Sequence, residues 1–153
     1  MTDIKALHDF IVTAKAATYV GGGDPAPPCR MGSHDLQFEQ GDFRYLDSYF
    51  GGADFIGQEV VYEKDTPVWA MNYYGRLLKP KKITAAEAGA MIKASLSQMY
   101  ADGRFLGGWD HALNDLVYHD RSEGDLTNFK GFEWIKKSGQ KVYELIYHGG
   151  LIR

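Results

Sequence analysis

The chain has 153 residues, which is the length of a single domain. Its content of 44% hydrophobic and 24% charged residues is typical of a globular protein and excludes a disordered one. The net charge of -3 lacks the basic excess that direct nucleic-acid binding requires, and the single cysteine, Cys29, excludes an internal disulfide and a cysteine-based metal cage.

The N-terminal segment lacks the features of an export signal. Asp3 and Asp9 interrupt its apolar positions, so it has no continuous apolar region. Elsewhere, no run reaches the roughly 18 apolar residues that a membrane-spanning helix needs. We therefore expect a cytoplasmic protein with no membrane partner, which folds as a single domain over residues 1–153.

Two helices and a series of strands follow one another along the chain. Apolar residues at helical spacing predict a first helix over 3–17, and a capping box of Thr84 and Glu87 begins a second helix over 84–101. Strands are predicted at 36–39, 43–50, 55–63, 67–77, 115–119, 128–137 and 141–148. This order indicates an α+β domain with a curved, mainly antiparallel sheet of six to seven strands and both helices on one face.

The second half of the chain resembles the first. At an offset of 74 residues, segment 55–78 aligns with 129–152 without a gap. The alignment predicts two tandem α-β-β-β repeats, over about 1–79 and 80–153. The alternative is a chance similarity between two hairpins that are both rich in glycine and tyrosine.

Shorter correspondences accompany the long one. Both predicted hairpins place their turn residues at the same position, Lys64-Asp65 and Ser138-Gly139. Upstream the similarity continues with insertions, and the matched segments are 35–38 with 115–118 and 41–43 with 124–126.

Glu59 and Glu133 occupy the same position in the two repeats. Each lies in the middle of a predicted strand between apolar neighbours, where a carboxylate is costly to bury without a partner. One interpretation is a ligand-facing carboxylate that binds a cationic or amine-bearing molecule. Rings suited to cation–π contacts with such a ligand are Trp69, Tyr73 and Tyr143. The other interpretation is structural, and its candidate partners are Arg30, Arg44, Arg76 and backbone amides.

Segment 41–55 places acids, a base and phenols next to a pair of glycines. Alternation puts Arg44 on one face of its strand and Tyr45 on the other, and the glycines allow a ligand to approach the backbone closely. A strand that ends in a tight turn with a surface ion pair is the alternative. The candidate ligand-binding set is completed by Tyr45, Arg44, Asn72 and His148.

Both faces of the hairpin strands carry apolar side chains. The two helices can cover one face, so the other has to meet a ligand, a long loop or a second subunit. We expect an aromatic cleft on the face opposite the helices, and its lining would consist of Trp69, Tyr73, Tyr143 and Tyr45 with Glu59 or Glu133.

Other chemistries have little support in the sequence. Three histidines are adjacent to an aspartate, but adjacent residues do not share a face of a strand or helix, so no metal site is predicted. Cys29 stands outside any known nucleophile motif, and the GGGD run follows a helix and not a strand. We predict no catalytic residue and no cofactor.

Five stretches carry a family resemblance: ATYVGGGD, GSHDLQFEQGDFRYLDSYFGGADFIGQEVVYEKDTPVWAMNYYGRLL, TAAEAGAMIKASL, GRFLGG and VYELIYHGGLIR. They resemble an uncharacterised bacterial and archaeal family, a domain of unknown function found alone or C-terminal to helix-turn-helix segments. The resemblance covers nearly the whole chain and implies a sensing or effector-binding role. Because this chain begins directly at its predicted helix, direct DNA regulation is not expected. The topology also resembles the duplicated effector-binding domain of gyrase-inhibitor-like regulators.

Three functions remain open at this point. The first is a module that binds a small molecule in an aromatic cleft. The second is a small enzyme that uses one of the glutamates as a general base, with its pKa raised by apolar walls. The third is a homodimerisation or protein-interaction module whose aromatic face is an interface. The sequence favours the first.

Overall fold

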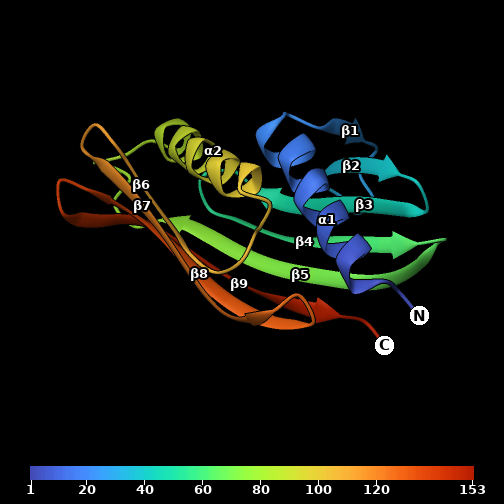
Figure 1. Ribbon diagram of the computed structural model, residues 1–153. Coiled ribbons are helices and arrows are strands. Elements are labelled where there is room, and N and C mark those ends of the chain that lie inside the picture. Colours follow the sequence, from blue (N-terminus) through green and yellow to red (C-terminus); the bar gives the residue numbers. More distant parts are fainter.

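One antiparallel sheet of nine strands forms a layer that is covered on one face by two helices (Figure 1). The computed structural model describes residues 1–153. The helical elements are α1 (Ile4–Lys15), the π-helical segment η1 (Ala16–Val20) and α2 (Ala85–Ala101). The strands are β1 (Asp24–Ala26), β2 (His34–Gln40), β3 (Phe43–Gly51), β4 (Phe55–Glu63), β5 (Thr66–Leu77), β6 (Trp109–Leu113), β7 (Leu116–Asp125), β8 (Asn128–Lys137) and β9 (Gln140–Leu151). No helix has the length and apolar character of a membrane span.

The architecture confirms the α+β class and the placement of both helices on one face, but the expected number of strands is wrong. The order in the sheet is β1-β2-β3-β4-β5-β9-β8-β7-β6, with every neighbouring pair antiparallel. The two strands missed from sequence, β1 and β6, lie at the two edges and have only three and five residues. Short edge strands need little apolar alternation, and β1 contains a proline, which sheets tolerate at their edges.

The strand order is symmetric about the middle of the sheet. β2 to β5 form one meander and β6 to β9 another, and the two meet where β5 pairs with β9. At this junction Tyr73 lies directly opposite Tyr147, and the next residues in the same row are Gly57 on β4 and Gly131 on β8. Residues matched by the sequence offset therefore occupy matching places in the two meanders.

Upstream of the hairpins, the structure corrects the sequence alignment. Tyr45 on β3 lies opposite Val61, and Tyr118 on β7 lies opposite Ile135, the residue that matches Val61 at the offset of 74. Tyr45 is therefore the counterpart of Tyr118. The predicted matches of 35–38 with 115–118 and of 41–43 with 124–126 fail because they pair β2 and the turn after it with β7 and the turn after it. The offset also changes by one residue, since residues 52–54 connect β3 to β4 and only 126–127 connect β7 to β8.

The turns of the two long hairpins have the predicted positions. Lys64 and Asp65 have φ values of 49° and 67°, and Ser138 and Gly139 have 49° and 79°. Two successive residues with positive φ are the signature of the type I′ turn, whose twist matches that of the strands it connects. The two hairpins thus share one turn geometry at one position.

Each helix begins directly after a residue whose side chain caps the helix N-terminus. The Asp3 carboxylate accepts hydrogen bonds from the backbone N–H groups of Lys5 and Ala6, and Thr84 and Glu87 form the predicted capping box. The chain continues from α1 into η1, whose wider turn changes the direction of the side chains that follow. Turns of this kind occur often at functional sites.

The core lies between the helices and the sheet. Its largest fully buried side chains include Tyr45, Trp69, Tyr118 and Tyr143, all on strands and all on the helix-facing side. α1 packs over β2 and β3, and α2 packs over β6 and β7. The opposite face of the sheet has no covering layer (Figure 1).

Candidate functional site

A cavity of about 430 Å³ lies between the helices and the middle of the sheet. α1 and η1 contribute Lys15, Thr18 and Tyr19, and α2 contributes Lys93, Leu96, Met99 and Tyr100. The polar part of the lining on the sheet consists of Asp47, Glu59, Asp120, Glu133 and several tyrosines. The volume falls in the range of natural small-molecule sites.

Four carboxyl groups face this cavity in two adjacent pairs. Asp47 on β3 is directly opposite Glu59 on β4, and Asp120 on β7 is directly opposite Glu133 on β8. All four residues are at most 5% exposed. Carboxylates are rarely buried without compensation, so the groups that contact them decide what the site can do.

Each carboxyl group accepts a hydrogen bond from a tyrosine, and the pattern is the same in both halves of the sheet. In the first half, Tyr45 donates to Glu59 Oε1 at 2.6 Å and Tyr73 donates to Asp47 Oδ1 at 2.7 Å. In the second half, Tyr118 donates to Glu133 Oε2 and Tyr147 donates to Asp120 Oδ1, the latter at 2.8 Å. Four buried acids are thereby held in place by neutral donors.

Two glycines allow Tyr73 and Tyr147 to reach across a neighbouring strand to their aspartates. Tyr73 on β5 reaches Asp47 on β3 by crossing β4 at Gly57, and Tyr147 on β9 reaches Asp120 on β7 by crossing β8 at Gly131. A Cβ on either glycine would lie closer than 3.0 Å to the phenol that crosses it. Glycine is therefore required at both positions for a steric reason, which explains why the sequence repeats it.

We expect Gly131→Ala to displace Tyr147 from Asp120 and to lower the free energy of unfolding by roughly 1–3 kcal/mol, as overpacked cores do. Chemical denaturation measures this loss. Gly52→Ala is the comparison, because a Cβ there would meet no atom within 4 Å and the backbone does not have a positive φ. A Gly131→Ala variant that is as stable as Gly52→Ala would contradict the steric argument.

Lys15 is the only buried cation at the cavity. Its ammonium donates to Glu59 Oε2 at 2.6 Å, and the side chains of the pair are 5% and 7% exposed. The same nitrogen lies 5.5 Å from the centre of the Phe105 ring. Glu133 has no such partner, and its second oxygen instead accepts a hydrogen bond of 3.1 Å from the Tyr143 hydroxyl. The site thus has four buried acids and one buried ammonium, and Lys93 adds an exposed ammonium to the lining.

This imbalance affects the acidity of the carboxyl groups. Burial, together with the neighbouring Glu59, raises the pKa of Asp47 to about 7. Burial and the neighbouring Asp120 raise the pKa of Glu133 to about 7. Burial raises the pKa of Asp120 to about 6, although the hydrogen bond from Tyr147 opposes the change. These three groups therefore exchange protons near neutral pH.

Several polar atoms at the cavity have no protein partner. Asp47 accepts a hydrogen bond at Oδ1 but none at Oδ2, and the hydroxyls of Tyr19 and Tyr100 form no hydrogen bond. No fully buried side-chain nitrogen or oxygen lacks a partner. These three unpaired groups therefore lie where the cavity gives access to them, and Tyr100 does so although its side chain is only 9% exposed.

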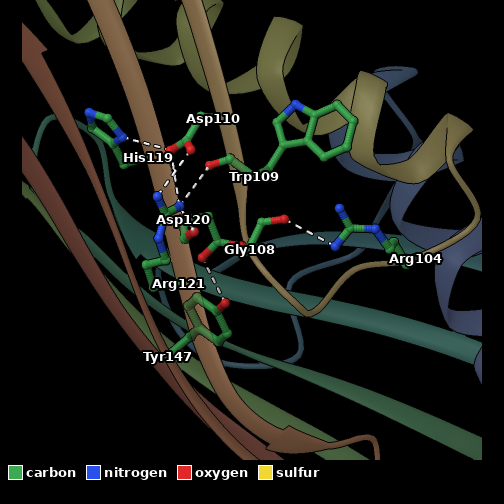
Figure 2. A network of polar contacts seen from close by, with 8 residues as sticks. All are labelled: Arg104, Gly108, Trp109, Asp110, His119, Asp120, Arg121 and Tyr147. Atoms are coloured by element: carbon green, nitrogen blue, oxygen red, sulfur yellow. Dashed lines mark hydrogen bonds and ion pairs between the residues drawn. The ribbon is translucent and has the colours of Figure 1, made fainter.

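A separate polar network fixes the strand that carries Asp120. Arg121 forms two hydrogen bonds of 3.0 Å with Asp110, which also contacts His119 Nδ1 at 2.7 Å. Figure 2 shows that the Arg121 guanidinium turns to Asp110 on β6, whereas the Asp120 carboxylate turns to Tyr147. The nearest arginine is therefore engaged with another acid.

Six of the nine predicted site residues lie on the helix-facing side of the sheet: Glu59, Glu133, Trp69, Tyr73, Tyr143 and Tyr45. The aromatic lining expected for a cleft opposite the helices lies on the other face, because the ring-rich face is the one that the helices cover. A second hollow, of about 520 Å³, does lie on the uncovered face, and its lining includes Asn72 and His148. Among the six, Glu59, Glu133 and Tyr73 line the cavity. Tyr45 and Tyr143 support the two glutamates from the core, and Trp69 donates to the backbone carbonyl of Leu126 at 3.1 Å.

The other three predicted residues lie on the outer face, away from the cavity. Arg44 forms an ion pair of 3.1 Å with Asp65, which is the surface ion pair of the alternative interpretation. Asn72 accepts a hydrogen bond of 2.8 Å from Gln58, and His148 is exposed directly opposite Asn72. The arginine partners considered for the two glutamates are also wrong, since Lys15 and tyrosines take that role.

Sequence reasoning missed Lys15 and Asp120 as site residues, and it placed Asp47 in the candidate segment 41–55 without including it in the ligand-binding set. Lys15 is the last residue of an amphipathic helix, where a lysine usually points to solvent. The two aspartates had a recognisable signal, because a Tyr-x-Asp pattern occurs at 45–47 and again at 118–120. The incorrect upstream alignment concealed it.

Comparisons with known proteins give one result that bears on the site. The family model DUF5680, described as a domain of unknown function, matches residues 47–152. No curated protein and no solved structure matches the chain. All four acids of the cavity lie inside the matched region, whereas Lys15 and η1 lie outside it.

Proposed function

We propose that this chain, which belongs to the DUF5680 family, a domain of unknown function, is a binding module for a small organic cation. The observation that carries the proposal is the charge of the cavity, where four buried carboxyl groups face one buried ammonium. A cationic ligand supplies the missing positive charge and gains charge-assisted hydrogen bonds in a poorly hydrated site. A neutral ligand supplies no charge, and its hydrogen bonds to the carboxylates lack the attraction between opposite charges.

The remaining lining fits an amine with an apolar body. Tyr19, Tyr73, Tyr100 and Phe105 present rings to the cavity, and such rings attract cations through their π faces. Met71, Met99 and Leu145 supply adaptable apolar surface for the rest of the molecule. No group of three or more His, Cys, Asp and Glu residues has the arrangement of a metal site, so the proposal is limited to an organic cation.

A sensing role in the cytoplasm of a bacterium or archaeon is part of the proposal. It is supported by the sequence resemblance, which includes members that follow a helix-turn-helix segment. The proposal also takes the two halves of the sheet to be products of tandem duplication. The symmetric strand order and the two hairpins with equal turns support that origin.

The test is a thermal-shift and calorimetric screen of short alkylammonium and guanidinium ions, each paired with the neutral alcohol or amide of the same shape. We expect the cations alone to raise the melting temperature at pH 8, because the acids are then ionised. We also expect affinity to fall at pH 6 and protons to be released on binding near pH 7. Equal binding of the neutral molecules would contradict the proposal.

A second candidate function rests on Asp47. Its pKa of about 7 and its oxygen without a hydrogen bond suit a general base that takes a proton from a bound substrate. Asp47→Asn separates the two functions. An enzyme loses turnover in a metabolite screen and retains substrate binding, whereas a receptor shows no turnover before or after the change.

A further inference from the structure

The two helices place different residues at matching positions above the sheet. Their N-caps, Asp3 and Thr84, are 81 positions apart, and the same offset relates their buried residues. The matched buried pairs are Leu7 with Ala88, Phe10 with Met91, Ile11 with Ile92, Ala14 with Ser95 and Thr18 with Met99. At this offset Tyr19 corresponds to Tyr100, and Lys15 corresponds to Leu96, which lines the same cavity.

The acid pair of the second half therefore lacks the internal cation of the first. Glu59 contacts the Lys15 ammonium, whereas Glu133 contacts the neutral hydroxyls of Tyr118 and Tyr143. A hydroxyl satisfies a hydrogen bond but does not neutralise a carboxylate. The position from which an ammonium would reach the second pair holds the leucine.

Two other cations lie near the second pair, but neither binds its carboxylates. Arg121 follows Asp120 on β7, but its guanidinium is held by Asp110 on the far side of the strand (Figure 2). Lys93 on α2 contributes to the lining, is exposed and forms no ion pair. Neither takes the place that Lys15 occupies in the first half.

A second observation indicates that a ligand belongs in this cavity. Tyr100, on the last turn of α2, is only 9% exposed and lines the cavity, yet its hydroxyl has no hydrogen-bond partner. An ammonium group has three N–H donors, and the cavity offers it the carboxylates of Asp120 and Glu133 as well as this unpaired hydroxyl.

We infer that Asp120 and Glu133 form a subsite for the primary ammonium group of a ligand, which binds there as Lys15 binds Glu59 in the other half. The inference rests on the proposed function and deepens it by naming the ligand class. The contact of 2.6 Å between Lys15 and Glu59 is a hydrogen-bonded ion pair, which needs an N–H donor. The subsite therefore selects primary alkylammonium ions over quaternary ones.

The probes are n-butylammonium, tetramethylammonium and 1-butanol, measured by calorimetry at pH 8 on the full chain. We expect n-butylammonium to bind at least tenfold more tightly than tetramethylammonium, with no binding of 1-butanol. Leu96→Lys places an internal ammonium above Asp120 and Glu133, so it should weaken n-butylammonium binding at least tenfold. Ala90→Lys adds the same charge to an exposed position of α2 and should leave binding unchanged.

Glu133→Gln serves as a second variant in case a lysine at position 96 prevents folding, and it should also weaken n-butylammonium binding at least tenfold. Full-strength binding to folded Leu96→Lys or to Glu133→Gln would overturn the subsite. Equal affinity for the primary and quaternary ions would overturn it too, while leaving a cation receptor intact. If none of the cations binds the unaltered chain, the proposed function fails together with the subsite.

Discussion

Lys15→Met is expected to lower the free energy of unfolding by about 3–5 kcal/mol at pH 8, the usual effect of removing one partner of a buried ion pair. The change leaves the Glu59 carboxylate buried beside Asp47, with Tyr45 as its only donor. Urea denaturation at pH 8 measures the loss.

Two further variants make this result specific to the buried pair. Lys15→Met combined with Glu59→Gln should recover most of the lost stability, because the uncompensated charge is then absent. Lys5→Met breaks an ion pair with Asp9 in which the lysine side chain is 85% exposed, and it should produce no measurable change. A Lys15→Met protein with unchanged stability would show that Glu59 does not depend on the ammonium.

The second large effect is a loss of stability between pH 5 and pH 8 in the absence of ligand. The folded-state pKa values of Asp47, Glu133 and Asp120 are about 7, 7 and 6, whereas unfolded carboxyl groups titrate near 4. The folded state therefore holds protons more tightly, and the stability that they contribute is fully present below about pH 4. It is lost as the pH rises through about 7.

Between pH 5 and pH 8 the three titrations cover about 2, 2 and 1 pH units, so at about 1.4 kcal/mol per unit the expected loss is up to about 7 kcal/mol. Denaturation curves at pH 5, 6.5 and 8 measure it, and Asp47→Asn should flatten the dependence. The carboxyl groups with lowered pKa values, such as Asp110 and Asp125, act in the opposite direction but only below this window. Stability that is constant or rises up to pH 8 would contradict the protonation states described here.

The elements of the fold follow from the sequence wherever a local rule applies. The capping box at Thr84 begins a helix at its predicted position, and the two matched turns give two matched hairpins. β1 and β6 do not follow from sequence, since short edge strands carry no regular pattern and are formed by pairing with β2 and β7.

The candidate site is predictable only in part, because alternation separates two faces without showing which face the helices cover. The sequence groups Trp69 with Tyr73 and sets both apart from Asn72, and the structure agrees with that grouping. Both faces carry apolar residues, so the choice between them depends on tertiary packing. The contact of Lys15 with Glu59 spans 44 positions and is likewise set by where α1 crosses the sheet.

The buried lysine at one end of the cavity has a consequence for the orientation of an elongated ligand. A cavity with two equivalent ends would bind such a molecule in two opposite orientations. Lys15 would repel a positive head group from its own end, so one orientation would dominate. The difference between Lys15 on α1 and Leu96 on α2 thus makes the two ends of the cavity electrostatically different, although the strands are arranged symmetrically.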